Sequence, residues 1–138
     1  MKITVLAVGK IRPPFTEPEA HYLKLSRPRQ QIEVVEVKDD AALVRRAGSG
    51  SRLVALEYGG KQMSSEEWAT WLDRRRHEGR NVTMLIGGPA GLPDELRHRA
   101  DETVSLGRHT MAHQLARIVL LEQVFRAGKI LAGEKYHL

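Results

Sequence analysis

One short stretch near the middle of the chain limits the possible folds more than any other. Residues 82–86 are apolar and include β-branched side chains, a pattern typical of a strand buried on both faces of a parallel sheet. The segment that follows, residues 87–91, contains three glycines and a proline. Because glycine has no Cβ, its backbone can approach a ligand closely. We therefore predict a central strand at residues 82–86 and, directly after it, the floor of a binding site.

Strand and helix patterns alternate along the whole chain. The other strand candidates are residues 2–8, 32–37, 53–56 and 102–106. The helix candidates are residues 16–26, 40–47, 64–79, 92–99 and 112–127. Pro13 and Pro14 predict a loop after the first strand, and the glycines within residues 57–61 predict a turn after the third. This order predicts an α/β fold with a mostly parallel sheet flanked by helices, in a single domain that spans residues 1–138.

The last predicted helix, residues 112–127, is unusual because apolar residues cover most of its circumference. A helix of this kind has to be covered on more than one side, and a short chain has few elements that can do so. We therefore predict a homodimer that buries part of this helix. Its polar exceptions, His113 and Arg117, lie one turn apart and are expected to face the protein or a ligand rather than bulk water.

Composition excludes several kinds of protein and site. The hydrophobic share of 41% and the charged share of 28% are ordinary for a globular protein, so long disordered segments are not expected. The chain has no cysteine, and no His-x-x-x-His pair has an acidic residue nearby, so we expect neither disulfides nor a metal. No apolar run is long enough for a signal peptide or for the roughly 20 residues of a membrane span. A cytoplasmic protein without a membrane partner is the expectation.

The balance of charges suggests a polyanionic partner. The formal net charge is +5 and the isoelectric point is about 9.8, which makes nucleic acid the obvious candidate. The lysines and arginines are spread along the chain, however, and form no basic tail. A solvated basic surface therefore explains the charge equally well.

The glycine-containing segment does not fit the common phosphate-binding motifs. Its glycines have the wrong spacing for the dinucleotide fingerprint, and no Gly-Lys-Ser or Gly-Lys-Thr follows to form a P-loop. Pro89 removes one N–H group that a phosphate cradle would use. No serine lies in a Gly-x-Ser-x-Gly nucleophile elbow. Two interpretations remain: a pocket for an uncharged heterocycle or nucleoside, or a turn that only joins a strand to a helix.

Four motifs, taken in order, resemble those of one family. They are Leu56 followed by Gly59-Gly60-Lys61, the segment 86–92, Ser105-Leu106 leading into residues 110–117, and Glu134-Lys135-Tyr136-His137 near the C-terminus. Together they resemble the ribosomal RNA large subunit methyltransferase H family, also called the YbeA-like family, of the SPOUT or alpha/beta-knot class. The resemblance extends over nearly the whole chain and is densest from residue 82 onward.

This resemblance implies a fold, an activity and partners. Members of the family are homodimers of a single-domain alpha/beta knot, in which the C-terminal part of each chain forms a trefoil knot. Knots are nearly absent from proteins in general, so this expectation rests on the family alone. The family uses S-adenosylmethionine to methylate N3 of a pseudouridine in 23S ribosomal RNA. The expected partners are therefore 23S ribosomal RNA, within the ribosome, and a second copy of the chain.

The resemblance also assigns roles to individual residues. By position, the cofactor-binding residues would be Leu56, Gly87, Gly88, Leu106, Gly107, Arg108, His109, Thr110 and Met111. His113 and Arg117 would flank the uracil as catalytic residues. Tyr136 and His137 would close the site as further catalytic residues, from the same subunit or from the partner subunit. Two of these residues have simpler explanations: His113 could be a structural residue at a helix start, and Arg117 could form an ion pair across the dimer.

Three differences from the family pattern affect these expectations. Residues 38–51 are shorter than the usual segment, Glu57 stands where aspartate is usual, and the chain ends in Leu138 where lysine or arginine is usual. Lys135 or Arg108 would have to replace that terminal cation. Two alternative functions stay open: a knotted methyltransferase that modifies another RNA base or a ribose, and a non-catalytic ribosome-binding assembly factor.

Overall fold

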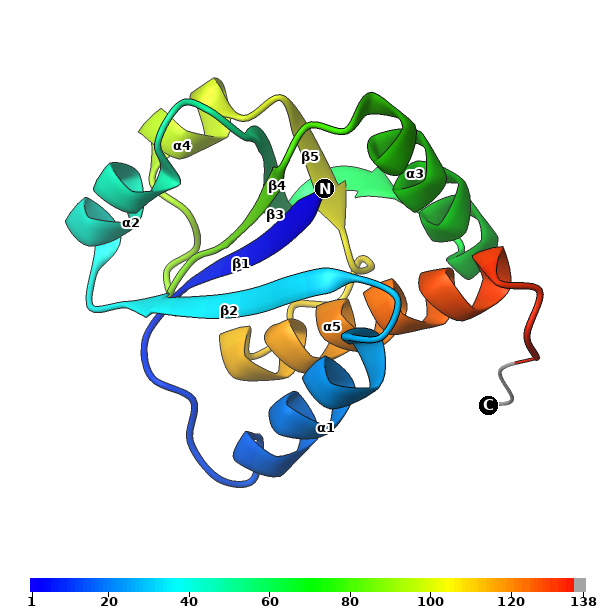
Figure 1. The fold of residues 1–138 in the computed structure, drawn as a ribbon. Helices are drawn as coiled ribbons and strands as arrows, with labels where there is room; N and C mark the ends of the chain where they lie inside the picture. Colours follow the sequence, from blue (N-terminus) through cyan, green and yellow to red (C-terminus); the bar gives the residue numbers. More distant parts are fainter. Residues whose placement is uncertain (136–138) are drawn as a thin grey trace.

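Strands and helices alternate along residues 1–135, the part of the chain that the computed structural model describes (Figure 1). The strands are β1 (Lys2–Val8), β2 (Gln31–Val37), β3 (Arg52–Gln62), β4 (Val82–Ile86) and β5 (Glu102–Ser105). The helices are α1 (Thr16–Ser26), α2 (Asp40–Ala47), α3 (Ser65–Glu78), α4 (Asp94–Arg99) and α5 (His113–Leu131). Each element overlaps a predicted one, although α5 continues beyond its predicted end. The predicted α/β fold is confirmed.

The strands are parallel and form one sheet with the order β2-β1-β4-β3-β5. β4 lies in the centre, between β1 and β3, and every residue from Val82 to Ile86 is buried. A parallel strand in this position is covered on both faces, which explains the apolar run in the sequence. The carboxyl end of β4 therefore delivers the glycine-containing segment to the middle of one edge of the sheet.

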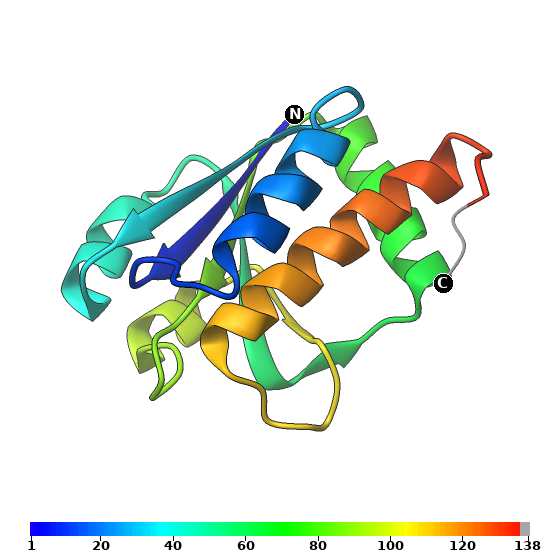
Figure 2. The same ribbon diagram turned by 90° about the horizontal axis from the view of Figure 1, so that it is seen from below.

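Helices cover both faces of the sheet (Figures 1 and 2). α1, α3 and α5 lie on one face, where Val82, Met84 and Ile86 belong to the larger hydrophobic core. α2 and α4 lie on the other face, where Leu85 belongs to a second core. Because successive side chains of a strand point to opposite faces, β4 contributes to both cores.

α5 lies between α1 and α3 across the sheet (Figure 2). Leu120, Leu121 and Val124 are buried within the larger core. Leu115, in contrast, is 41% exposed, and Val119 is half-buried. Most of the apolar surface of α5 is thus covered within the chain, and a partner would cover only its outer stripe. The homodimer stays a prediction.

The predicted turn at residues 57–61 is wrong, because β3 continues through it. The pairing of β3 with β5 shifts register between Leu56 and Lys61, as it does at a β-bulge. A Cβ built on Gly60 would lie 2.7 Å from the carbonyl carbon of Val104 on β5. Gly60 therefore permits two strands to approach closely instead of reversing the chain, two uses of glycine that a sequence pattern does not distinguish.

Gly60→Ala tests this close approach. We expect the free energy of unfolding to fall by about 2 kcal/mol, because the added methyl group overlaps with backbone atoms of the neighbouring strand. Gly59→Ala is the control, since a Cβ at Gly59 meets no atom within 4 Å. Urea denaturation followed by circular dichroism measures both variants. Equal stability of the two variants would contradict the steric role of Gly60.

Candidate functional site

A cavity of about 630 Å³ opens at the carboxyl edge of the sheet, next to β3, β4 and β5. Ligands of parallel α/β sheets bind at this edge. The lining comes from residues 56–58, 86–91, 105–107 and 109–113, together with Ala116. These segments are far apart in the sequence, and they meet because β3 lies between β4 and β5 in the sheet.

The glycine-containing segment after β4 is a tight turn on one side of the cavity. The N–H of Gly91 donates a hydrogen bond to the carbonyl oxygen of Gly88 (2.9 Å). A Cβ built on Gly87 would lie 2.4 Å from backbone atoms of Gly91, so a side chain does not fit there. Gly91 itself has a φ of +86°, a conformation that favours glycine. The segment is therefore both a strand-to-helix turn and a wall of the cavity. These two features do not exclude each other.

The loop between β5 and α5, residues 106–112, forms another wall. Ser105 is buried and holds the beginning of this loop. Its hydroxyl donates a hydrogen bond to the carbonyl oxygen of Gly107 (2.8 Å) and accepts one from the N–H of the same residue (3.1 Å). The loop leads directly into α5, so His113 and Ala116 in the first turns of the helix also line the cavity.

Most of the predicted cofactor-binding residues lie in the cavity lining. They are Leu56, Gly87, Gly88, Leu106, Gly107, His109, Thr110 and Met111. Arg108 is exposed and is not part of the lining. The sequence analysis missed Tyr58, which lines the cavity and is 61% exposed. Its position was not predicted because the bulged part of β3 has the sequence pattern of a turn.

The two predicted catalytic residues of α5 lie in different environments. His113 lines the cavity at the start of the helix. Arg117, one turn later, is 1% exposed and is not part of the cavity lining. We expected Arg117 to flank the substrate base or to pair across a dimer, but its guanidinium group is engaged within the chain.

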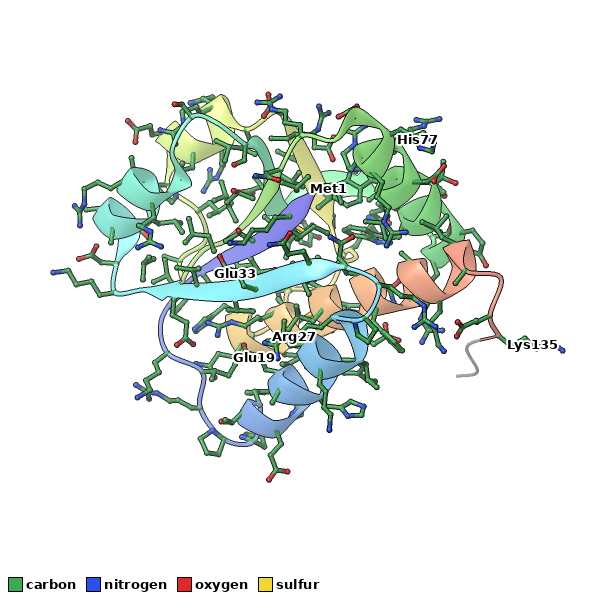
Figure 3. All side chains as sticks on the ribbon, viewed as in Figure 1. Met1, Glu19, Arg27, Glu33, His77 and Lys135 are labelled. Carbon is green, nitrogen blue, oxygen red and sulfur yellow. The ribbon has the colours of Figure 1, made fainter. Side chains whose placement is uncertain are left out.

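Arg117 connects α5 to three other elements. Its Nη1 donates hydrogen bonds to Oε2 of Glu19 on α1 (3.0 Å) and to Oε2 of Glu36 on β2 (2.7 Å). Its Nη2 donates to the carbonyl oxygen of Gly9, directly after β1 (3.0 Å). Figure 3 shows Glu19 between α1 and α5. These contacts compensate a positive charge that would be very costly to bury alone.

The environment of Glu36 favours its ionised form. Burial by itself raises the pKa of this carboxyl group. Hydrogen bonds from Arg117 and from the N–H of Ile11, together with the positive charges of Arg117 and Lys10, outweigh burial and lower the pKa below its ordinary value. Glu36 is therefore a carboxylate at neutral pH and remains the ion-pair partner of Arg117.

The C-terminal residues that the resemblance singled out, Tyr136 and His137, lie outside the described part of the chain, as does Leu138. Their roles stay predictions. Within residues 1–135, no group of three or more histidine, aspartate or glutamate side chains is arranged to hold a metal ion. None of the helices described there combines the length and the apolar character needed to cross a bilayer.

Comparison with known proteins identifies the family. A family model described as "Predicted SPOUT methyltransferase" matches residues 1–137. The chain belongs to the SPOUT methyltransferase family. A protein of Carboxydothermus hydrogenoformans named "Ribosomal RNA large subunit methyltransferase H" is 39% identical over an alignment of 158 positions that covers 99% of each chain. A Pseudomonas putida protein of the same name is 37% identical over an alignment of 154 positions, again with 99% of each chain covered.

Solved structures share the fold at low sequence identity. A probable methyltransferase from Bordetella pertussis Tohama I has a TM-score of 0.63 and 14% identity, over 91% of this chain and 95% of the other. A putative methylase family protein from Neisseria gonorrhoeae has a TM-score of 0.61 and 10% identity, over 99% of this chain and 95% of the other. At these identities the comparison establishes a common fold alone. The trefoil knot of the SPOUT class stays a prediction for this chain.

The cavity suits S-adenosylmethionine, the cofactor that SPOUT methyltransferases generally use. Its volume of about 630 Å³ lies within the range of small-molecule sites, roughly 300–1,000 Å³. Its walls consist largely of backbone and apolar side chains, which suits a nucleoside without phosphate groups. Glu57, the acidic residue among the described lining residues, is paired with Nε of Arg97 (2.8 Å).

Glu36→Gln tests the electrostatic role of Glu36. Because its folded-state pKa is lowered, ionised Glu36 stabilises the fold above the pKa of an unfolded glutamate, about 4.3. This contribution is lost as the pH falls through the folded-state pKa. We therefore expect the wild type to lose more unfolding free energy than Glu36→Gln between about pH 5 and pH 3, as measured by urea denaturation. Parallel stability profiles of the two proteins would refute this explanation.

Proposed function

We propose that this protein is an RNA methyltransferase that transfers a methyl group from S-adenosylmethionine to N3 of a pseudouridine in 23S ribosomal RNA. The observation that carries the proposal is the backbone-lined cavity at the carboxyl edge of the sheet, in a chain of the SPOUT methyltransferase family. The names of the full-length relatives support ribosomal RNA as the substrate. The choice of a pseudouridine and of N3 rests on the resemblance of the motifs.

Leu56, Gly88 and the lining residues of the loop after β5, namely residues 106, 107 and 109–111, would hold the cofactor. Leu56 lies within β3 at the register shift, and the others follow the ends of β4 and β5. Those that line the cavity offer backbone groups and apolar contacts. When bound, S-adenosylmethionine supplies an electrophilic methyl group on a positively charged sulfur. Gly87 keeps the turn after β4 compact, so that the cavity stays open to a ligand. Arg108, which lies outside the lining, is better placed to meet RNA than cofactor.

His113 is the α5 side chain best placed to contact the RNA base, because it lines the cavity where the helix begins. N3 of the base carries a proton, so methylation requires loss of that proton and stabilisation of the negative charge that develops. His113 would hydrogen-bond to the base or accept this proton. Tyr136 and His137, by the resemblance, would close the site over the base.

Arg117 would be a positioning residue instead of a catalytic one. Its bonds to Glu19, Glu36 and Gly9 hold the first turns of α5 against α1, β2 and the end of β1. The same turns carry His113. A side chain that is fixed before the substrate binds needs less reorganisation during the reaction.

A second copy of the chain would cover the outer stripe of α5. Leu115 and Val119, one turn apart, are two apolar residues of this helix that α1, α3 and the sheet leave partly uncovered. Burial of such side chains against a partner is favourable by about 25 cal/mol per Å² of apolar surface. We propose a homodimer formed through this stripe, in agreement with the resemblance.

Methyl transfer is tested on ribosomes and free 23S ribosomal RNA from a strain that lacks the enzyme. The purified protein and S-adenosylmethionine are added, and mass spectrometry locates the modified nucleotide. We expect one new methyl group, on N3 of a pseudouridine. A methyl group on another base or on a ribose would support the first alternative function. No binding of S-adenosylmethionine in a calorimetric titration would support the non-catalytic assembly factor.

Removal of residues 136–138 tests the role of the tail. We expect turnover on ribosomes to fall about 100-fold or more, because the truncated protein loses Tyr136 and His137 from the reacting site. The affinity for S-adenosylmethionine and the oligomeric state, measured by calorimetry and light scattering, should be unchanged. Removal of Leu138 alone is the control and should retain turnover. Full activity of the longer truncation would disprove the proposed role of the tail.

A further inference from the structure

The segment between β1 and α1 presents two positive charges that lie outside the cavity described above. We refer to residues 9–15 as the cationic segment. Lys10 and Arg12 are exposed, and neither residue lines the cavity. Within residues 1–135, neither side chain forms a hydrogen bond or an ion pair. The charge of Lys10 acts on Glu36 through space, but no such bond within the described residues holds Lys10 or Arg12. Such surface cations usually only keep a protein solvated, whereas here the backbone that carries them is fixed.

Side chains from β2 and α5 hold the backbone of the cationic segment. The N–H of Ile11 donates a hydrogen bond to Oε2 of Glu36 (2.6 Å). The amide group of Gln114 binds on both sides of Ile11: its Oε1 accepts from the N–H of Arg12 (3.0 Å), and its Nε2 donates to the carbonyl oxygen of Lys10 (2.9 Å). The segment has therefore lost most of its freedom on folding, so binding a partner requires little further ordering.

The cationic segment lies beside the cavity. Gln114, which fixes the segment, directly follows His113 in the first turn of α5, and His113 lines the cavity. A Cβ built on Gly9 would lie 3.9 Å from Nε2 of His113. Both ribbon views place the segment next to the start of α5 (Figures 1 and 2). The backbone that carries Lys10 and Arg12 is thus held close to the residue proposed to contact the substrate base.

We propose that the cationic segment is a preformed contact for the phosphate backbone of the RNA substrate, in which Lys10 and Arg12 bind phosphates near the target nucleotide. This inference rests on the proposed function, because it takes RNA as the substrate. Contacts to phosphates fix the register of a protein on a nucleic acid, whereas contacts to the bases determine which sequence is recognised. A rigid cationic segment next to His113 would therefore set the position of the strand relative to the cavity. An acidic protein surface is the competing partner, and RNA is favoured because its base has to enter the adjacent cavity.

The double variant Lys10→Gln/Arg12→Gln tests the contact, because it removes both charges and keeps polar side chains. The affinity for 70S ribosomes is measured at several salt concentrations. Each lost phosphate contact reduces counterion release, so the slope of log affinity against log salt should decrease in magnitude by about two. Affinity near physiological salt should fall roughly tenfold. The affinity for S-adenosylmethionine, measured by calorimetry, should stay the same, since neither residue lines the cavity.

Arg45→Gln/Arg46→Gln is the matched control, because it makes the same change in net charge at two exposed residues. Both lie at the end of α2, on the opposite face of the sheet from α5. We expect this control to keep the salt dependence of the wild type. An equal decrease of the slope in both double variants would mean that overall charge governs binding, and an unchanged slope in Lys10→Gln/Arg12→Gln would mean that another partner or none binds there. Either result overturns the proposal.

Gln114→Leu tests whether the segment has to be fixed in advance. It removes both amide hydrogen bonds to the backbone of the segment and leaves Lys10 and Arg12 in place. We expect the slope of log affinity against log salt to stay that of the wild type. The affinity for ribosomes should fall about fivefold, because the released segment has to be ordered on binding. If this variant binds ribosomes as tightly as the wild type, the contact does not depend on being fixed in advance.

The inference and the proposed function fail in different ways. If the wild type binds ribosomes but transfers no methyl group, the proposed function fails, and the salt dependence still tests the segment. If the wild type methylates 23S ribosomal RNA and Lys10→Gln/Arg12→Gln keeps its slope, the contact alone is disproved. If the wild type binds neither ribosomes nor free 23S ribosomal RNA, both are overturned.

Discussion

The buried guanidinium group of Arg117 is the interaction on which the functional edge of this protein depends. A cation that is 1% exposed is very unfavourable unless its charge is compensated, and Glu19, Glu36 and the carbonyl oxygen of Gly9 provide that compensation. To do so, α1, β2 and the end of β1 have to converge on α5. Glu36 also accepts a hydrogen bond from the N–H of Ile11. The ion pair that positions α5 therefore also positions the cationic segment.

Two kinds of surface meet at this edge, and they have different physical origins. One wall of the cavity is built from backbone segments that approach closely because Gly87 has no Cβ. Such walls give shape and hydrogen-bonding groups but little charge, which suits a nucleoside cofactor. The charges near the cavity are instead carried by the cationic segment, outside the lining. In the proposed function, binding of the methyl donor and positioning of the RNA therefore use separate parts of the same edge.

Most of the secondary structure could be predicted, because the local patterns are strong. Residues 82–86 are apolar because β4 is buried on both faces, and the glycines that follow mark the turn that lines the cavity. The prediction failed at residues 57–61, where Gly60 serves a close contact with Val104 of another strand. Tyr58 was missed as a cavity residue for the same reason. A glycine in a turn and a glycine in a bulge look alike until the neighbouring strand is known.

The sequence by itself determined the order of strands and helices, the glycine turn at residues 87–91 and the resemblance to the methyltransferase family. These features depend on periodicity and on residue identity, which are local. Only the tertiary structure decided that β3 lies between β4 and β5, so that three separate segments enclose one cavity. It also decided that Arg117 meets Glu19 and Glu36, which are 98 and 81 residues away along the chain. A helix pattern shows that a cation faces inward. Which carboxylates compensate its charge depends on how distant elements pack against the helix.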